Sequence, residues 1–436
     1  MIVVIWISTF LFFWIAYHRF THGHFTRHLG FYHYILYFVA IYWGALDLYQ
    51  SRGSVNSLFL MSVFLYPVLS FCGMLWACII RNRTFYPKVE VFTKPKDVNL
   101  VVVAVLFFLA IFGCYIYTLW PNIPIVIALQ NSHMDAHVAR YLSTKAYRHE
   151  IFGLNFLYWL PRILIDYFGI FVIVFFYYKF RHTFKDRFKL ALIVLAVFVI
   201  GIVANEKYPI VKMYAIFALC FFNKNYFVVS RRAIVSSVSI VTAGITVTGI
   251  LYILVTAKIE ELTNIGFFGV IYKVFVERGW ALLSSRGVTG QCVPLYVIYD
   301  LIPHKYDFFM GRTFSNPHGI LPYEPVALPY LIYESYNLPV SKNLRGADPT
   351  VFFGEIYANF GFLISCLSMF LFGAILQIVN DRLSLKIAQK KTSFYVAFFY
   401  LMMAYLGDFA IGFSVPYFDE RLLFFVGFYF LTRLKL

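Results

Sequence analysis

The sequence predicts an all-α protein that crosses a membrane many times. Of its 436 residues, 61% are hydrophobic and only 13% are charged, whereas a soluble domain averages about 45–50% apolar and about 25% charged residues. The apolar residues form long runs, and a helix needs about 20 of them to cross the hydrocarbon core. The chain is therefore long enough for about eleven spanning helices. The aromatic content of 21% suits the interfacial belts of such proteins.

Hydropathy places these helices in order along the chain. The predicted spans are about 2–17, 31–50, 57–80, 100–120, 159–178, 190–204, 208–222, 233–257, 351–378, 394–413 and 421–433. This division gives eight helices and a shorter loop at 121–158 within residues 1–257, a long loop at 258–350, and three helices within 351–436. Interfacial helices are expected in the long loop, as at 266–283. Its Pro- and Gly-rich stretch at 311–329 is expected to be irregular.

The basic residues indicate an orientation. A net charge of +16 in a soluble protein would suggest nucleic acid, but here about 21 of the 37 Lys and Arg residues lie in alternate loops, the pattern of cytoplasmic loops. Nucleic acid is therefore not expected as a partner, and the loops at 121–158 and 258–350 are predicted to lie outside. Four histidines on the cytoplasmic side are expected to contact lipid headgroups: His22, His24, His28 and His33.

The two outer loops carry arginines against the positive-inside trend. These are Arg140, Arg148, Arg278, Arg286, Arg312 and Arg345. Because a guanidinium group donates two parallel hydrogen bonds to a phosphate, the clustering predicts an anionic ligand such as a pyrophosphate. The alternative is that they pair with headgroups or loop carboxylates. Tyr323 and the other loop tyrosines suit either sugar stacking or an interfacial belt.

A polar stretch turns directly into an apolar helix at 345–361, which reads RGADPTVFFGEIYANFG. Glu355 is expected one to two turns inside this helix, where a carboxylate beside lipid is costly and so faces protein or a wet cavity. Asp348, Glu355 and His318 are the candidates for a base that accepts a proton from an attacking hydroxyl. Alternatively, Glu355 pairs with an arginine, and Asp348 caps the helix with Pro349 as its first residue.

No pattern predicts a metal or a cofactor. His133 and His137 would share a helix face in the first outer loop, but no third ligand follows at a recognisable spacing. No Walker-type or dinucleotide-binding glycine motif occurs. The six cysteines lie mostly in apolar segments and do not form a disulfide framework.

Three runs in the second half of the chain read YKVFVERGWALLSSRGVTGQ, FMGRTFSNPHGILPYEP and DPTVFFGEIYANFG. These runs resemble Wzy-type polymerases of O-antigen or similar oligosaccharide repeat units. The resemblance covers about 265–365 by motif and the remainder by topology. It implies a GT-C-like helical bundle in the bacterial inner membrane, with an active site that faces the periplasm and uses neither metal nor nucleotide sugar.

The resemblance also implies the reaction and the partners. The growing chain would pass from one undecaprenyl pyrophosphate onto the non-reducing end of a new lipid-linked unit, with loop arginines on the pyrophosphate. Membrane lipids and a Wzz-type chain-length regulator are the other implied partners.

Two alternatives remain open. Related O-antigen ligases carry a histidine near the start of the corresponding helix, where this chain has Asp348, Pro349 and Thr350, and this favours a polymerase over a ligase. A transporter or flippase for lipid-linked sugars would have two related halves and charges along a central path. No internal repeat is found, and the charges gather at one face.

Overall fold

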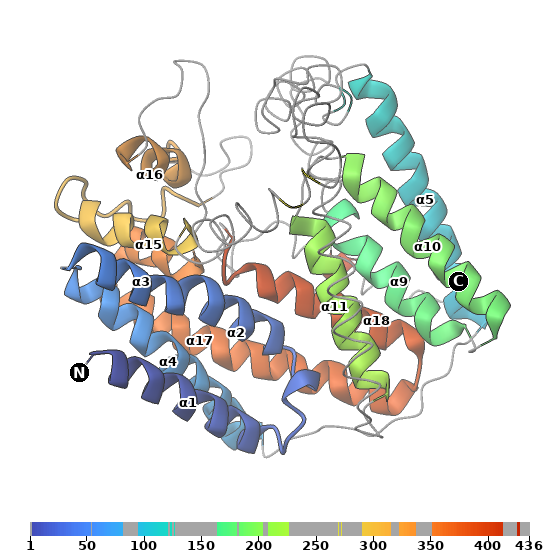
Figure 1. The fold of residues 1–436 in the computed structure, drawn as a ribbon, viewed down its shortest axis with the longest axis horizontal. Helices are drawn as coiled ribbons and strands as arrows, with labels where there is room; N and C mark the ends of the chain where they lie inside the picture. The colour runs from blue at the N-terminus through green and yellow to red at the C-terminus, as the bar shows by residue number, and fades with distance from the viewer. Residues whose placement is uncertain are drawn as a thin grey trace. The chain divides into compact units, whose positions relative to one another are not determined.

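The computed structural model describes residues 2–53, 55–81, 95–120, 164–180, 183–203, 208–225, 290–314, 322–336, 351–412 and 425–427, and the single residues 123, 126, 269 and 272. The regular elements of these segments are helices (Figure 1). The chain divides into two compact units. The first comprises Met1–Pro87, Ala281–Leu385 and Tyr405–Leu436, and the second comprises Lys88–Trp280 and Lys386–Ala404.

The first unit begins with aromatic helices packed side by side. Helix α1 (Ile2–Phe20) is followed by α2 (Phe31–Tyr37), which continues through a π-helical segment (Phe38–Tyr42) into α3 (Trp43–Arg52). Helix α4 (Ser57–Arg81) packs against α1, with the ring centroids of Trp6 and Phe64 4.3 Å apart. Helices α15 (Gly290–Leu301) and α16 (Leu328–Tyr336) arise from the predicted long loop, and α15 packs against α3 and α4.

The second unit is organised around helix α9. Its described elements are α5 (Pro95–Leu119), a π-helical segment (Leu164–Phe168), α9 (Gly169–Lys179), α10 (Phe184–Val203) and α11 (Tyr208–Asn225). A Cβ atom at Gly169 would lie 2.4 Å from Val197 Cγ1, so glycine lets α9 approach α10 closely. In α18 (Ser393–Asp408), the hydroxyl of Tyr400 accepts a hydrogen bond of 2.8 Å from Asn223 Nδ2.

The all-α class predicted from the sequence is confirmed in the described segments. Most of the described helices overlap predicted spans, whereas α15 and α16 lie within the predicted loop at 258–350. Among these helices, four are long and apolar enough to cross a membrane: Val3–Phe20, Ser57–Arg81, Lys96–Cys114 and Phe352–Lys390. Large apolar side chains are exposed on them, such as Phe12 at 68% and Leu363 at 80%. The span at 233–257 and most of that at 421–433 lie outside the described residues, and a total of about eleven spanning helices stays a prediction.

Helix α17 (Phe352–Lys390) folds back on itself at Gly361, which has φ +79° and ψ −174°, a conformation that other residues rarely adopt. The Ser365 hydroxyl donates to the Phe353 carbonyl over 2.9 Å, and the rings of Phe352 and Phe372 are 4.8 Å apart. A straight helix would hold these two rings about 30 Å apart. Residues 352–360 therefore form a short arm that runs antiparallel to the start of a long arm, residues 362–390.

The reversal and the start of α17 correct three details predicted from the sequence. An uninterrupted helix was predicted over 351–378, because the apolar pattern continues unchanged through Gly361. The helix begins at Phe352, so Glu355 lies in its first turn rather than deeper, and Pro349 is not its first residue.

The long arm of α17 crosses α4 at two glycines. A Cβ atom on Gly73 would lie 2.0 Å from the Phe370 carbonyl oxygen, and one on Gly373 would lie 1.9 Å from the Ser70 carbonyl oxygen. Only a hydrogen atom fits at either position, so the two backbones are in direct contact. Small residues at such crossings allow close helix packing in membranes. We call this pair of residues the glycine crossing.

Two histidines contradict the expectation that they contact headgroups, because His28 and His33 are both fully buried. The His28 ring accepts a hydrogen bond from the Tyr17 hydroxyl over 2.7 Å and donates to Gln377 Oε1 over 2.9 Å. Burial lowers the pKa of His28 to about 4, although the bond to Gln377 opposes this shift. His28 is therefore neutral, and its hydrogen bond to Gln377 joins the connection after α1 to the long arm.

Candidate functional site

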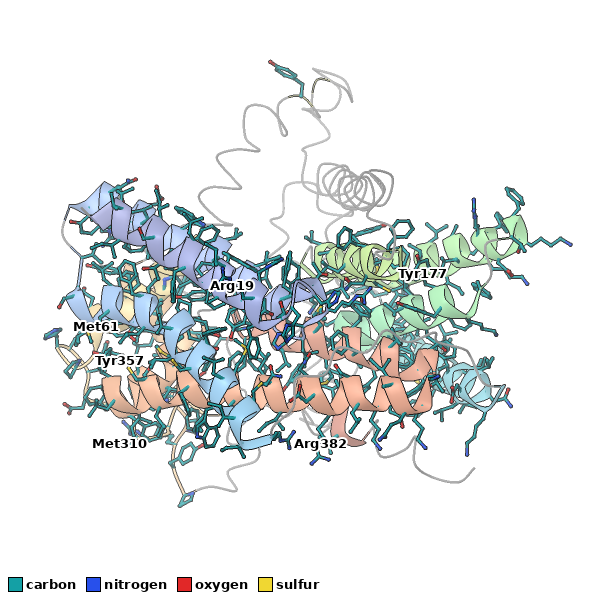
Figure 2. All side chains as sticks on the ribbon, turned by 90° about the horizontal axis from the view of Figure 1, so that it is seen from below. Arg19, Met61, Tyr177, Met310, Tyr357 and Arg382 are labelled. Atoms are coloured by element: carbon teal, nitrogen blue, oxygen red, sulfur yellow. The ribbon has the colours of Figure 1, made fainter. Side chains whose placement is uncertain are left out.

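A turn at 309–314 lies against the C-terminal end of the short arm. The Phe309 N–H donates to the Ala358 carbonyl over 3.0 Å, and the Met310 N–H donates to the Asn359 carbonyl over 3.1 Å. Because the last carbonyls of a helix lack partners within it, the turn acts as the cap of this arm. Figure 2 shows Met310 and Tyr357 at the same end of α17, with Arg382 farther along that helix.

Three side chains join the turn to the short arm, and we call Thr313, Glu355 and Asn359 the polar clamp. The Thr313 hydroxyl donates to Glu355 Oε1 over 2.8 Å. Asn359 Nδ2 donates to Thr313 Oγ1 over 2.6 Å and to the Glu355 carbonyl over 2.9 Å. Asn359 Oδ1 accepts from the Gly311 N–H over 2.8 Å and, more weakly, from the Thr313 N–H over 3.5 Å. Asn359 is fully buried and Glu355 partly buried.

Glycine and aromatic residues shape the surroundings of the clamp. Gly311 has φ +89°, a value that glycine adopts without strain. A Cβ atom at Gly361 would meet the Phe308 ring at 3.4 Å, so this ring covers the point where α17 reverses. The rings of Phe314 and Phe360 lie 5.9 Å apart, next to the same turn. Apolar rings exclude water, which strengthens the hydrogen bonds they cover.

Helix α15 supports the site from a second direction. The rings of Tyr299 and Tyr357 stack with centroids 3.9 Å apart, and the Tyr357 hydroxyl donates to the Ile302 carbonyl over 3.0 Å. The Tyr299 hydroxyl donates to Ser62 Oγ on α4 over 2.6 Å. Burial raises the pKa of Tyr299, so this phenol stays a hydrogen-bond donor. Contacts with α15, which in turn bonds to α4, therefore hold the short arm that carries Glu355 and Asn359. A functional site needs rigid support of this kind.

Arg312 lies in the middle of the turn, and its side chain is exposed. Its carbonyl accepts a hydrogen bond of 2.7 Å from the Val326 N–H, and its own N–H donates to the Phe309 carbonyl over 3.0 Å. Close by, the Tyr323 hydroxyl donates to the Phe314 carbonyl over 3.3 Å. A fixed backbone therefore presents an exposed guanidinium group from a turn that also contacts Glu355 and Tyr323. A guanidinium can bind an anion, and a carboxylate can accept a proton.

The structure brings Glu355, Arg312 and Tyr323 into this one region. The other predicted site residues lie outside the described residues, so their roles stay predictions: Asp348, His318, Arg278, Arg286, Arg345, Arg140 and Arg148. Residues 311–314 and 322–327 are irregular, as predicted for that part of the loop. Sequence reasoning missed Thr313 and Asn359. The available signal was an asparagine four residues after Glu355 in an apolar helix, since i and i+4 share a face.

Comparisons with known proteins add no identification: no protein-family model, curated protein or solved structure matches the chain. Among the residues that the structure describes, no three His, Cys, Asp or Glu side chains are grouped so that they could hold a metal ion. Function is therefore inferred from the turn, the clamp and the apolar helices.

Proposed function

We propose that this protein is a membrane glycosyltransferase that polymerises oligosaccharide repeat units linked to undecaprenyl pyrophosphate. It would move the growing chain as a block onto a new lipid-linked unit at the periplasmic face of the bacterial inner membrane. The observation that carries this proposal is that one buried residue, Asn359, binds both chain neighbours of Arg312, Gly311 and Thr313, and also the Glu355 carbonyl. The apolar helices support a lipid-linked substrate, and the sequence resemblance supports the polymerase class.

The proposed reaction exchanges one bond for another. The hydroxyl oxygen of the acceptor sugar bonds to the anomeric carbon of the donor chain, and the bond from that carbon to the pyrophosphate oxygen breaks. The bonding electrons leave with the lipid pyrophosphate, whose growing charge Arg312 neutralises. Glu355 takes the hydroxyl proton, while Thr313 holds its Oε1 atom.

Other residues keep their proposed roles. Asp348 and His318 remain alternative bases. Further contacts to the pyrophosphate or the sugar chain are proposed for Arg278, Arg286, Arg345, Arg140, Arg148 and Tyr323. A GT-C-like bundle and a chain-length regulator as partner belong to the same proposal.

The test is an in vitro reaction in nanodiscs with the lipid-pyrophosphate-linked repeat unit of the host. The wild-type protein should form a ladder of products spaced by one repeat unit on a gel. Arg312→Ala should slow its formation by about a hundredfold, because one charge-stabilising group is lost. Arg382→Ala is the matched control: it removes an exposed arginine from the long arm and should leave the ladder intact.

The alternatives give different results. Transfer of the chain to a lipopolysaccharide core, without a ladder, would identify a ligase. Movement of lipid-linked units across proteoliposomes, without a new glycosidic bond, would identify a transporter or flippase. A ladder that persists in Arg312→Ala would support the polymerase and remove Arg312 from the site.

A further inference from the structure

Asn359 uses its whole hydrogen-bonding capacity at one place. A side-chain amide has two donor hydrogens and two acceptor positions. Both donors go to Thr313 Oγ1 and the Glu355 carbonyl, and the oxygen receives the N–H groups of Gly311 and Thr313, the latter in a long contact. Asn359 is fully buried, where an unpaired amide would be costly. Aspartate, leucine or alanine could not make the same set of bonds.

These bonds control the backbone around Arg312. The Asn359 oxygen holds the N–H groups of the residues immediately before and after the arginine. The Arg312 carbonyl is held separately by Val326. Because its neighbours are fixed, the Cα–Cβ direction of Arg312 is fixed as well, and with it the region that the guanidinium group can reach.

The same amide orients the carboxylate. Thr313 Oγ1 accepts a hydrogen from Asn359 Nδ2, so its own single hydrogen is directed to Glu355 Oε1. Among the described residues, Thr313 donates to this carboxyl group at Oε1, and Oε2 is the oxygen assigned to the substrate hydroxyl. Asn359 thus acts on the cation and on the base from one buried position.

We infer that Asn359 is a positioning residue, which aligns Arg312 with the leaving group and Glu355 with the attacking hydroxyl. The alignment of Arg312 and Glu355 with reacting groups rests on the proposed function. The structural part of this inference, the control of the Gly311–Thr313 backbone, can be tested without any substrate.

Limited trypsin digestion in nanodiscs measures that structural part, because trypsin cleaves after Arg312 only when the turn opens. In the wild-type protein, both the carbonyl and the following N–H of the cleavage site are engaged. Asn359→Ala should raise the rate of cleavage after Arg312, followed by mass spectrometry, by roughly tenfold. Asn223→Ala is the matched control, since it removes a buried asparagine that bonds to Tyr400 in the second unit, and it should not change this cleavage.

Chain-elongation kinetics measure the functional part. Asn359→Ala should lower kcat by about tenfold to a hundredfold, as expected for misplaced reacting groups, and change the KM for the donor much less. Thr313→Val should lower kcat as well, whereas Thr313→Ser, which keeps the hydroxyl, should restore it. A purely structural role would not distinguish serine from valine in this way once folded protein is selected.

The outcomes separate the two claims. Faster cleavage together with a lower kcat supports the positioning role. Unchanged cleavage in Asn359→Ala overturns it, and so does faster cleavage with full elongation. If wild-type protein makes no ladder while Asn359→Ala is still cleaved faster, the proposed function fails and the control of the turn by Asn359 stands.

Discussion

The two arms of α17 are held by different physical means. Polar side chains bind the short arm to an irregular turn, and its carboxylate at Glu355 is only partly buried. The long arm is held by backbone contact across the glycine crossing and by the fully buried His28. One hydrogen bond contributes a net stability of about 1 kcal/mol, and its polar groups can find other partners. Two backbones in direct contact leave no room for an added atom, so a larger side chain there forces the helices apart.

This difference assigns a role to each arm. The long arm acts as a frame, so substitutions at its packed positions should lower stability and activity together, unlike a change at exposed Arg382. The short arm carries adjustable polar groups next to exposed Arg312, so substitutions in the clamp should lower activity more than stability. Four experiments, from the largest expected effect to the smallest, test how each arm is held, and the clamp variants described above test its effect on activity.

Gly373→Ala should cause the largest loss of stability. The added Cβ atom would lie 1.9 Å from the Ser70 carbonyl oxygen, so α4 and the long arm must separate. We expect a loss of about 3 kcal/mol in the free energy of unfolding, measured by denaturation in detergent. Gly113→Ala on α5 has no atom within 4 Å of its Cβ position and should cause no loss. If Gly373→Ala is as stable as Gly113→Ala, the long arm is not a close-packed frame.

Gly361→Asn should have the next largest effect, because the reversal of α17 requires a φ, ψ combination of +79° and −174°. We expect a loss of about 2 kcal/mol in stability and loss of elongation, since the short arm is displaced. Gly53→Asn is the control: Gly53 has φ +71° and ψ −28°, a left-handed conformation that asparagine tolerates. Equal losses of stability in Gly361→Asn and Gly53→Asn would show that the reversal of α17 does not require a backbone conformation restricted to glycine.

Acidification should weaken the long arm through His28. Its pKa is about 4 in the folded protein and about 6.5 for an exposed histidine, so the unfolded chain takes up the proton first as the pH falls. This group alone should lower stability by about 1 kcal/mol between pH 7 and pH 5.5, an effect that His28→Gln removes. Thermal unfolding of both proteins at the two pH values measures it. A wild-type protein that gains stability over this range would mean that His28 is charged when folded.

Tyr357→Phe should have the smallest effect, because it removes one buried hydrogen bond and keeps the ring stacked on Tyr299. We expect a loss of about 1 kcal/mol in stability. Tyr117→Phe, at a side chain that is 86% exposed on α5, should cause none. Identical unfolding of the two variants would show that the bond to Ile302 does not help to support the short arm.

Much of this organisation follows from local sequence. Most described helices occur where the apolar runs predicted them, since a helix that faces lipid needs an apolar stretch, whereas α15 and α16 lie in the predicted loop. Arg312 and Glu355 were also identifiable, because charged groups beside apolar helices are costly and so usually have a purpose. The link through Asn359 between Glu355 and the turn that carries Arg312 was not identifiable, since Gly311 and Asn359 are far apart in the chain and meet only in the fold.

By itself, the sequence determined the all-α class, the positions of the long apolar helices and the region in which charged groups gather, because hydropathy and charge are properties of short segments. Only the tertiary structure decided the reversal at Gly361, the partner of each glycine in the crossing and the burial of His28. Each of these depends on contacts between distant segments, and one glycine or histidine in an apolar stretch resembles any other until its neighbours in space are known.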